Sequence, residues 1–412
     1  MATPQTLDVL SRYLANGFRE ADYLNQPSAG QRYFGRGTTN SFTHFSPNAN
    51  DFDFEITRND EKTAALVARS GEGPSASLST PMGQLGQSTW FSRKYPWIVE
   101  EIPLTAEHLY NRVIPGEGPF EGLDPQTRLQ RYATEGYRIM IQRMERAQER
   151  LAWQSLTLGK QSANVFGTPG SLDYDWRRAA GNSITLTHGW GNAAGVPLTD
   201  LDTAAFQLRA VGHVEPHGVI MGSTAFSDFI FNTTLMNGAT IGGYASQIFY
   251  QYVSFNMNFK PDPMWDDFIS CGLRPKGKIQ TPAGFELTIF TYPQGYNDPT
   301  SGTWTKYLTD AYAVMISLDA RADRLFGPPD TLPMTSMDIQ RMMERFGFNP
   351  MLPPLPSNKW QAGDVITPQM FYVDSYEIGN RSNVTLRVQG APVFPTTQTD
   401  AIVTILNAGT ST

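Results

Sequence analysis

Two histidines with a glutamate between them are the residues best suited to metal chemistry. His213, Glu215 and His217 lie in the sequence HVEPHG, and this spacing of histidines occurs in some zinc sites. Pro216 prevents a continuous helix from presenting both rings on one face. The only cysteine, Cys271, excludes a site with two thiolates, and the Pro-Cys-x-x-Cys motif of zinc deaminases is absent. The sequence therefore predicts no metal site.

Glycine motifs that bind phosphate are also incomplete. Gly-x-Gly pairs occur at Gly35/Gly37, Gly71/Gly73 and Gly116/Gly118, but none of these follows a predicted strand and opens a predicted helix. Gly159 and Lys160 are followed by Gln161, where a phosphate loop has Ser or Thr, and they end a predicted helix. The Gly-x-Ser-x-Gly elbow of serine hydrolases is absent from the sequence. We therefore interpret these glycines as loop residues.

Adjacent acidic residues are the remaining candidates for acid–base catalysis. They occur at Glu100 and Glu101 and again at Asp266 and Asp267. Neighbouring acids are more typical of a solvated edge, because a general acid or base needs a pKa that its surroundings have tuned. With five histidines and no catalytic constellation, we expect no catalytic residues, no cofactor and no enzymatic activity.

The composition indicates a protein whose surface is covered in part by partner molecules. A chain of 412 residues is long enough for two or three compact units. Charged residues make up 17%, which is low for a monomer with a fully solvated surface, and the net charge of −7 disfavours nucleic-acid binding through a basic face. No apolar run approaches the ~18 residues of a membrane span, and the first residues lack a signal sequence, so we expect no membrane insertion and no secretion.

The first hundred residues contain two segments that cannot form a core of their own. Residues 1–49 are polar with spaced aromatics, such as Tyr33 and Phe34, and we expect them to lie on another surface. From residue 52 onward, apolar residues alternate with acids, and a Gly/Ser/Pro/Thr-rich stretch at 70–89 follows. This pattern predicts a long two-stranded hairpin, which is marginally stable in water without a supporting surface.

A long helix is the clearest element of the sequence. Apolar residues recur at spacings of three and four and form one stripe: Leu129, Ala133, Tyr137, Met140, Met144, Ala147 and Leu151. Asp124 can cap the helix, Pro125 suits its first position, and Gly159 suits its end. The period is closer to 3.6 than to the 3.5 of a coiled coil, so we expect the stripe to pack on a sheet.

The rest of the chain predicts short strands mixed with short helices. We expect strands at 183–187, 218–221, 285–292, 312–318, 384–388 and 401–406, and helices at 201–211, 224–235 and 336–346. The last of these helices lies within a proline-rich stretch, 327–363, which we interpret as an inserted connector. These elements predict an α+β fold.

Several segments, in order along the chain, resemble the lambda-type family of tailed-phage major capsid proteins, the major capsid protein E family. Residues 90–114 lead into the long helix that ends ERLAWQSLTLGK. Residues 190–222 contain WGNAAGVPLTDL and HVEPHGVIMGS, and residues 282–333 contain PAGFELTIFTYPQGYND and MISLDARADRLFGPPDTLP. The final segment is VTLRVQGAPVFPTTQTDAIVTI. The stretch 334–363 is longer than this family leads us to expect.

The resemblance implies the Hong-Kong-ninety-seven-type capsid fold, an α+β fold with four parts. These parts are an N-terminal arm at 1–49, an E-loop at 50–103, a P domain at 104–205 with a spine helix at 124–159 and closing strands at 376–412, and an A domain at 206–375 that includes the insertion 327–363. The spine helix of this fold corresponds to the long helix that the apolar stripe predicts.

The resemblance also implies a structural function. Copies of the chain would assemble as pentamers and hexamers into an icosahedral shell around phage double-stranded DNA, without sequence-specific binding. Scaffold, decoration and portal proteins would be partners, and the protein would assemble in the host cytoplasm and reside in the virion capsid. An encapsulin, a bacterial compartment with the same fold, is an alternative. A β-rich hydrolase or carbohydrate-binding module is another, given 24 Phe, 17 Tyr and 8 Trp.

Lys62 bears on whether such a shell would be covalently linked. Some capsids of this fold join an E-loop lysine to an asparagine of a neighbour, and Lys62 is the only lysine between residues 50 and 90. Asp60 and Glu61 lie beside it and favour its charged form, whereas attack on an amide requires the neutral amine. We therefore expect a shell without covalent links.

Overall fold

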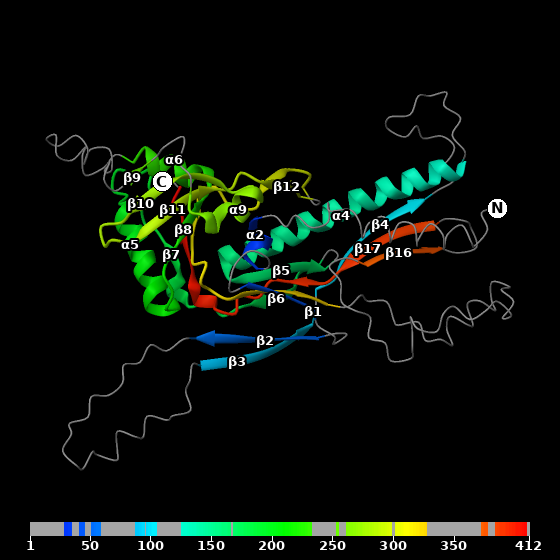
Figure 1. The fold of residues 1–412 in the computed structure, drawn as a ribbon, viewed down its shortest axis with the longest axis horizontal. Helices are drawn as coiled ribbons and strands as arrows, with labels where there is room; N and C mark the ends of the chain where they lie inside the picture. The colour runs from blue at the N-terminus through cyan, green and yellow to red at the C-terminus, as the bar shows by residue number, and fades with distance from the viewer. Residues whose placement is uncertain are drawn as a thin grey trace, which may run out of the picture.

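A computed structural model gives the arrangement of the chain and describes most of its predicted elements. The described residues are 29–34, 41–45, 51–58, 87–94, 96–104, 125–165, 168–232, 253–254, 261–298, 301–327, 372–377 and 384–409. Figure 1 shows a lobe built on a large sheet, and a long helix that leaves this lobe beside a smaller sheet.

The large sheet has seven strands and combines parallel with antiparallel pairs. Its order is β7 (Ser183–Thr185), β19 (Ile402–Leu406), β14 (Ala313–Ile316), β8 (Gly218–Met221), β11 (Glu286–Thr291), β10 (Arg274–Gln280) and β9 (Val253–Ser254). The pairs β7–β19 and β8–β11 are parallel, and the other pairs are antiparallel. The carboxyl-terminal strand β19 is thus an interior strand of a sheet whose other members come from residues 183–316.

Both faces of this sheet are buried, which explains the unbroken apolar sequences of its central strands. In β14, Ala313 and Met315 belong to one core cluster, whereas Val314 and Ile316 belong to a second. Alternate residues of a strand point to opposite faces, so a strand that is covered on both sides is apolar at every position. The predicted strands at 218–221, 285–292, 312–318 and 401–406 are confirmed within one or two residues at each end.

Different helices cover the two faces. On one face lie α5 (Pro197–Gln207), its continuation as a π-helix (Leu208–Gly212), and α6 (Ser223–Ile230). On the other lie α2 (Ala29–Tyr33), the end of α4 (Pro125–Leu158), a 3-10 turn (Pro263–Trp265) and α9 (Asp266–Ser270). The helix predicted at 201–211 begins four residues earlier, because Pro197 is suited to the first turn of a helix.

The long helix α4 is confirmed from Pro125 to Leu158. It packs along a three-stranded sheet of order β16 (Tyr372–Glu377), β17 (Val384–Gly390) and β4 (Ile98–Leu104). A Cβ atom on Gly136 would lie 3.4 Å from Cδ1 of Leu386, so the helix lies against β17 at this residue. Tyr137, Met140 and Met144 of the predicted stripe are buried, as expected for a helix that packs on a sheet.

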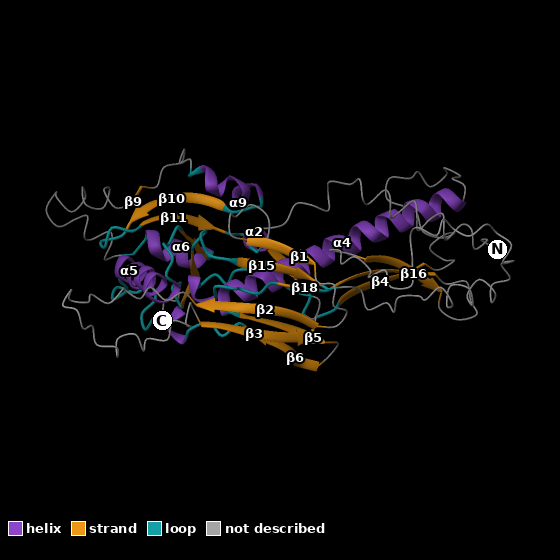
Figure 2. Cartoon of the chain, turned by 60° about the horizontal axis from the view of Figure 1, so that its bottom comes forward, coloured by secondary structure: helices purple, strands orange, loops and turns teal. Residues whose placement is uncertain are grey.

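Four smaller strand groups complete the described sheets, and three of them, those of β1, β2 and β5, are labelled in Figure 2. The predicted hairpin is confirmed in its described part: β2 (Asp51–Arg58) pairs antiparallel with β3 (Gln87–Lys94). The other groups are β5 (Lys160–Val165) with β6 (Thr168–Asp175), β12 (Gly295–Asn297) with β13 (Trp304–Lys306), and β15 (Ala322–Phe326) between β1 (Ser41–Phe45) and β18 (Pro392–Val393). Two 3-10 turns, Ala180–Asn182 and Thr399–Ala401, complete the described elements.

The amino-terminal region differs from the sequence prediction. It contains a helix, α2, and a strand, β1, neither of which the polar sequence indicates. Tyr33 and Phe34 are buried in the core of the same chain, so this part of the arm is held by its own subunit. The helix predicted at 336–346 and the rest of the proline-rich stretch beyond residue 327 lie outside the described residues. Among the described helices, none has the length and apolar character that a membrane span requires.

Candidate functional site

Helix α2 joins the body of the protein through a buried carboxylate. Glu149 lies near the end of α4 and is fully buried. Its Oε1 accepts a hydrogen bond of 2.8 Å from the backbone N–H of Gly30, and its Oε2 accepts one of 3.0 Å from the backbone N–H of Gln31. The first N–H groups of a helix have no partner within the helix, so Glu149 satisfies amides that burial would otherwise leave unpaired.

Two aromatic side chains complete the hydrogen bonds of this carboxylate. Trp153 Nε1–H donates to Glu149 Oε1 at 2.7 Å, and the Tyr292 hydroxyl donates to the same oxygen at 2.8 Å. The two rings stack with centroids 4.9 Å apart. Burial raises the pKa of Glu149 above the usual value of a glutamate, while the four hydrogen bonds act in the opposite direction. With four donors directed at it, Glu149 is best accommodated as a carboxylate.

Three further contacts hold α2 against the rest of the protein. The Gln31 side chain donates to the backbone oxygen of Glu145 at 3.0 Å, and Arg32 forms an ion pair of 2.6 Å with Asp267. The Tyr33 hydroxyl donates to the backbone oxygen of Ser317 at 3.0 Å. The fit is close, because a Cβ atom on Gly30 would lie 2.9 Å from the indole of Trp153. We call Gly30, Gln31, Glu149, Trp153 and Tyr292 the arm-docking cluster.

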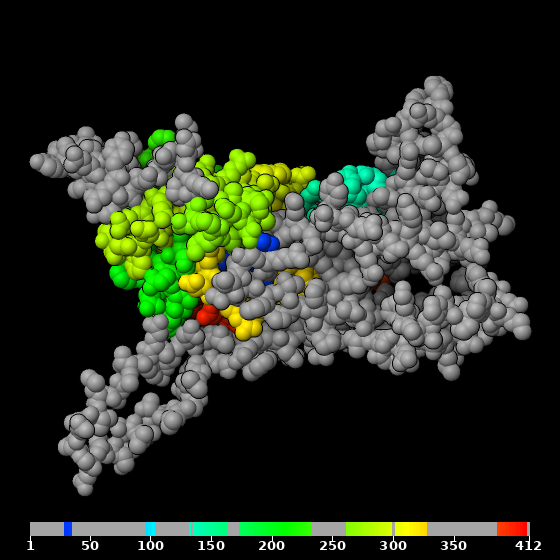
Figure 3. Space-filling view, in the orientation of Figure 1, coloured from blue at the N-terminus to red at the C-terminus, as the bar shows by residue number. Residues whose placement is uncertain are grey.

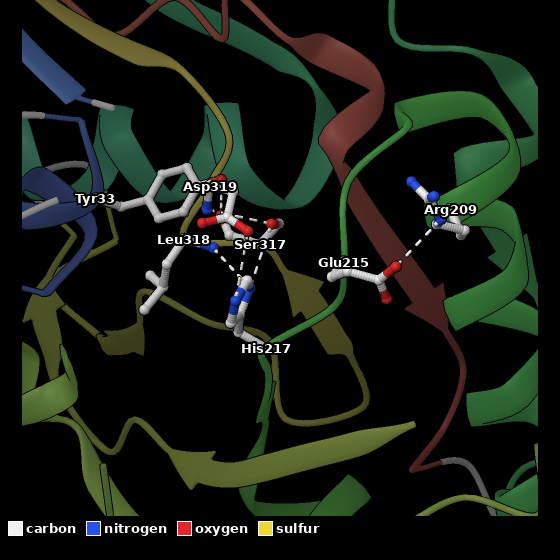
Figure 4. Close-up of polar contacts among 7 residues, drawn as sticks. All are labelled: Tyr33, Arg209, Glu215, His217, Ser317, Leu318 and Asp319. Atoms are coloured by element: carbon white, nitrogen blue, oxygen red, sulfur yellow. Dashed lines mark hydrogen bonds and ion pairs between the residues drawn. The ribbon is translucent and has the colours of Figure 1, made fainter. Parts of the chain in front are cut away.

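The histidine motif does not form a metal site within the described residues. Figure 4 shows Glu215 directed toward Arg209, at 3.2 Å, while the His217 ring points away from Glu215 and lies near Asp319, at 3.5 Å. His213 follows the π-helix in a left-handed conformation, with φ of 54°. No group of three or more His, Cys, Asp or Glu side chains is arranged to hold a metal ion in the part of the chain that the structure describes.

Three of the four adjacent acidic residues have ion-pair partners, including Asp267, which pairs with Arg32. Glu100 pairs with Arg143 at 3.3 Å, and Glu101 lies 3.7 Å from Arg387. Gly159 follows α4 with φ of 63°, which confirms its role at the end of the helix. The pairs Gly35/Gly37, Gly71/Gly73 and Gly116/Gly118 lie outside the described residues.

Arg178 caps the carboxyl end of α4. Its guanidinium donates to the backbone oxygens of three consecutive residues, Ser155 at 2.9 Å, Leu156 at 2.7 Å and Thr157 at 3.1 Å. It also donates to the hydroxyl of Thr404 on β19, at 3.1 Å. The last carbonyl groups of a helix lack partners within it, so Arg178 both satisfies these oxygens and ties α4 to the large sheet.

Replacing Arg178 by lysine is expected to lower the free energy of unfolding by about 1–3 kcal/mol, because an ammonium cannot reach all four acceptors of the planar guanidinium. Chemical denaturation measures this loss. Arg177→Lys is the matched control, since Arg177 is exposed and adjacent, and its substitution should change the free energy much less. Equal stability of the two variants would contradict the capping role.

The arm-docking cluster is a feature that sequence patterns did not identify. The available signal was weak: Glu149 stands four residues before Trp153, a spacing that places both on one helix face. Its other partners are more than 100 residues away, with sequence separations of 119 to Gly30 and 143 to Tyr292. Such contacts depend on the tertiary fold.

Comparison with known proteins identifies the fold. No protein-family model matches the chain, and no curated protein matches it significantly. A prophage protein of Escherichia coli CFT073, assigned as a capsid protein, is similar over 97% of this chain and 98% of its own, with a TM-score of 0.56 and 16% identity. The chain therefore has a phage capsid-like fold of the α+β class, which confirms the resemblance at the level of the overall fold.

Two further solved structures are less similar. A phage-related protein of Bordetella bronchiseptica RB50 has a TM-score of 0.41 and 11% identity, with 98% of this chain and 97% of its own covered. The holo-SrpI encapsulin complex of Synechococcus elongatus PCC 7942 has a TM-score of 0.39 and 10% identity, with 88% and 84% covered.

Proposed function

We propose that this chain is a major capsid protein whose copies assemble, as pentamers and hexamers, into an icosahedral shell that encloses phage double-stranded DNA. The observation that carries this proposal is the fold shared with the prophage protein over 97% of the chain. The sequence motifs support it independently, because they follow one another along the chain in the order of the phage capsid family.

The proposal divides the chain into the four parts that the resemblance to the phage capsid family implies. We assign the N-terminal arm to 1–49, the E-loop to 50–103, the P domain to 104–205 with 376–412, and the A domain to 206–375. Helix α4 with β17 supports the P domain, and α6 with β8, β10, β11 and β14 supports the A domain. Several elements depart from this division. β7 and β19 belong to the large sheet and α5 packs on it, although most of their residues fall in the P-domain ranges, whereas most of β4 and of β16 falls outside those ranges.

The β2–β3 hairpin supports assembly. Each strand pairs only with the other among the described residues, and the hairpin lies at the edge of the molecule (Figure 1). A two-stranded hairpin gains little stability in water unless its apolar residues find a surface. A neighbouring copy in a shell would supply that surface. The net charge of −7 is compatible with a shell that encloses DNA without binding it tightly.

The proposed partners and location follow from this function. The protein would reside in the virion capsid after assembly in the host cytoplasm, with scaffold, decoration and portal proteins as further partners. An encapsulin shell is the alternative with the same fold, and it would enclose proteins in place of DNA. A hydrolase or carbohydrate-binding module has no supporting feature among the described residues.

Sedimentation and negative-stain electron microscopy of the purified full-length chain test the proposal. We expect capsomers or closed shells, and particles isolated from the native source should contain nuclease-protected double-stranded DNA. A monodisperse monomer at high micromolar concentration would refute a shell function. Particles that contain a defined enzyme and no DNA would support the encapsulin alternative.

Mature particles are expected to be held without covalent links between subunits. Lys62 lies outside the described residues, so this expectation rests on its acidic neighbours in the sequence. Particles boiled in detergent should give one band near the 45.8 kDa of the chain on a denaturing gel. A ladder of larger bands that disappears with Lys62→Arg would show that the expectation is wrong.

A further inference from the structure

Three arginines form a stripe on the solvent-exposed side of α4. Arg143, Arg146 and Arg150 follow one another at spacings of three and four residues, which keeps them on one helix face. The side chain of Arg143 is 54% exposed even with Glu100 at 3.3 Å. Arg146 is exposed and has no ion pair within 4 Å among the described residues. The stripe therefore carries positive charge that the described part of the subunit neutralises only in part.

The two acidic residues that lie between these arginines in the sequence do not cancel this charge. Glu149 is fully buried, and its carboxylate accepts from the four donors of the arm-docking cluster. Glu145 is partly buried, and burial raises the pKa of its carboxyl to about 7, while the charges of Arg146 and Arg324 act in the opposite direction. Glu145 therefore carries only part of a negative charge at neutral pH.

Aromatic residues of the β12–β13 region border the stripe. The guanidinium of Arg150 lies 5.3 Å from the ring centroid of Tyr296, and this ring stacks on Tyr307 with centroids 5.3 Å apart. Burial and the charge of Glu149 raise the pKa of the Tyr307 phenol, whereas the charge of Arg146 lowers it, so Arg146 lies near the same ring. Figure 3 shows the surface of α4 beside the yellow surface of this region. We call Arg143, Arg146, Arg150, Tyr296 and Tyr307 the arginine–aromatic surface.

The chemistry of this surface suits phosphate groups. A planar guanidinium presents paired N–H donors that match two oxygens of one phosphate, and stacking on a ring keeps these donors free at its edge. Successive arginines of the stripe are separated by about 4.5 and 6 Å along the helix, which is about 10 Å in all. A strand of duplex DNA presents one phosphate per ~3.4 Å of the axis, so the stripe is as long as a row of about three phosphates. An array of one charge and of this length fits the repeating backbone of a duplex.

We propose that the arginine–aromatic surface contacts phosphates of the double-stranded DNA that the shell encloses, and that this side of α4 lines the interior of the shell. The contact rests on the proposed shell function and names the surface of the subunit that meets the DNA. Phosphate contacts carry no sequence information, so a shell with this contact encloses DNA of any sequence. The net charge of −7 limits the strength of the contact in one subunit, and repetition over the many copies of a shell adds these weak contacts together.

The salt dependence of binding to a short DNA duplex, prepared in two unrelated sequences, tests this contact in the full-length chain. The logarithm of the binding constant should fall with the logarithm of the salt concentration with a slope of about −2.7, because each of three phosphate contacts contributes about −0.9. Arg146→Gln and Arg150→Gln should each reduce the size of the slope by about 0.9, and the two sequences should bind equally. Thermal unfolding should be unchanged in Arg146→Gln, because Arg146 is exposed. Arg138→Gln is the matched control with an unchanged slope, since Arg138 is exposed on the same helix but pairs with Glu135, outside the stripe.

Particles provide a second measurement. Arg146→Gln should form shells as the wild type does, because the contact is made with DNA and not with another subunit. In filled wild-type particles, electron cryo-microscopy should show the outermost DNA against the exposed side of α4. DNA density that stays away from α4 would contradict the contact.

The outcomes separate this contact from the shell function. If the wild-type chain does not bind the duplex even at low salt, or if the arginine variants keep the slope of the wild type, the contact is wrong while the shell function stands. Arginine variants that bind the duplex normally but no longer form shells would also overturn the contact, since the stripe would then serve a protein partner. A wild-type chain that remains monomeric would overturn the shell function and this contact together.

Discussion

Replacing Met144 by aspartate is expected to leave no soluble, folded protein. Met144 is fully buried on the stripe of α4. Removing the side chain costs about 2–5 kcal/mol of packing. A buried carboxylate without a partner adds a penalty of several kcal/mol. Together these approach the total stability of a domain, which is about 5–15 kcal/mol. The soluble fraction after expression, followed by circular dichroism of any soluble protein, measures the effect.

Two control variants distinguish burial from a general effect of substitution on α4. Met144→Leu keeps the apolar volume and should cost less than about 1.5 kcal/mol. Arg138→Asp introduces the same carboxylate at a position whose side chain is 56% exposed, and it should fold. If Met144→Asp were soluble with a normal melting transition, the assignment of the buried face of α4 would be wrong.

Replacing Glu149 by leucine is expected to destabilise the protein strongly and to detach α2. Four buried donors would lose their acceptor, namely the amides of Gly30 and Gln31, the Trp153 indole and the Tyr292 hydroxyl. Each orphaned donor costs about 1–3 kcal/mol, so the sum is a large part of the stability of a domain. Hydrogen exchange provides a local readout, because the amides of Gly30 and Gln31 should lose their protection.

A graded series tests whether the hydrogen bonds of Glu149 cause this effect. Glu149→Gln retains one acceptor oxygen, so its loss of stability should lie between those of the wild type and the leucine variant. Glu145→Gln is the matched control, because Glu145 accepts from Gln31 through its backbone oxygen, which the substitution leaves in place. Unchanged exchange of Gly30 and Gln31 in Glu149→Leu would show that α2 is held by other contacts.

The elements that could be predicted from sequence are those whose pattern is local. The helix from Pro125 to Leu158 combines a periodic apolar stripe with a suitable start and stop, and the structure has the same ends. The central strands could be located because burial on both faces makes them continuously apolar. These signals do not depend on which segments meet, so the sequence by itself determined the α+β class and the face of α4 that packs on a sheet.

Other features depend on contacts that only the tertiary structure decides. A glutamate next to an apolar stripe looks solvated in sequence, yet Glu149 is buried because α2 supplies two N–H donors from 118 and 119 residues away. Likewise, α2 has five residues, too few to be stable without packing, and β1 forms only because β15 offers a parallel edge. The arm-docking cluster could not be predicted, since the burial that gives each residue its role arises from partners far away in the chain.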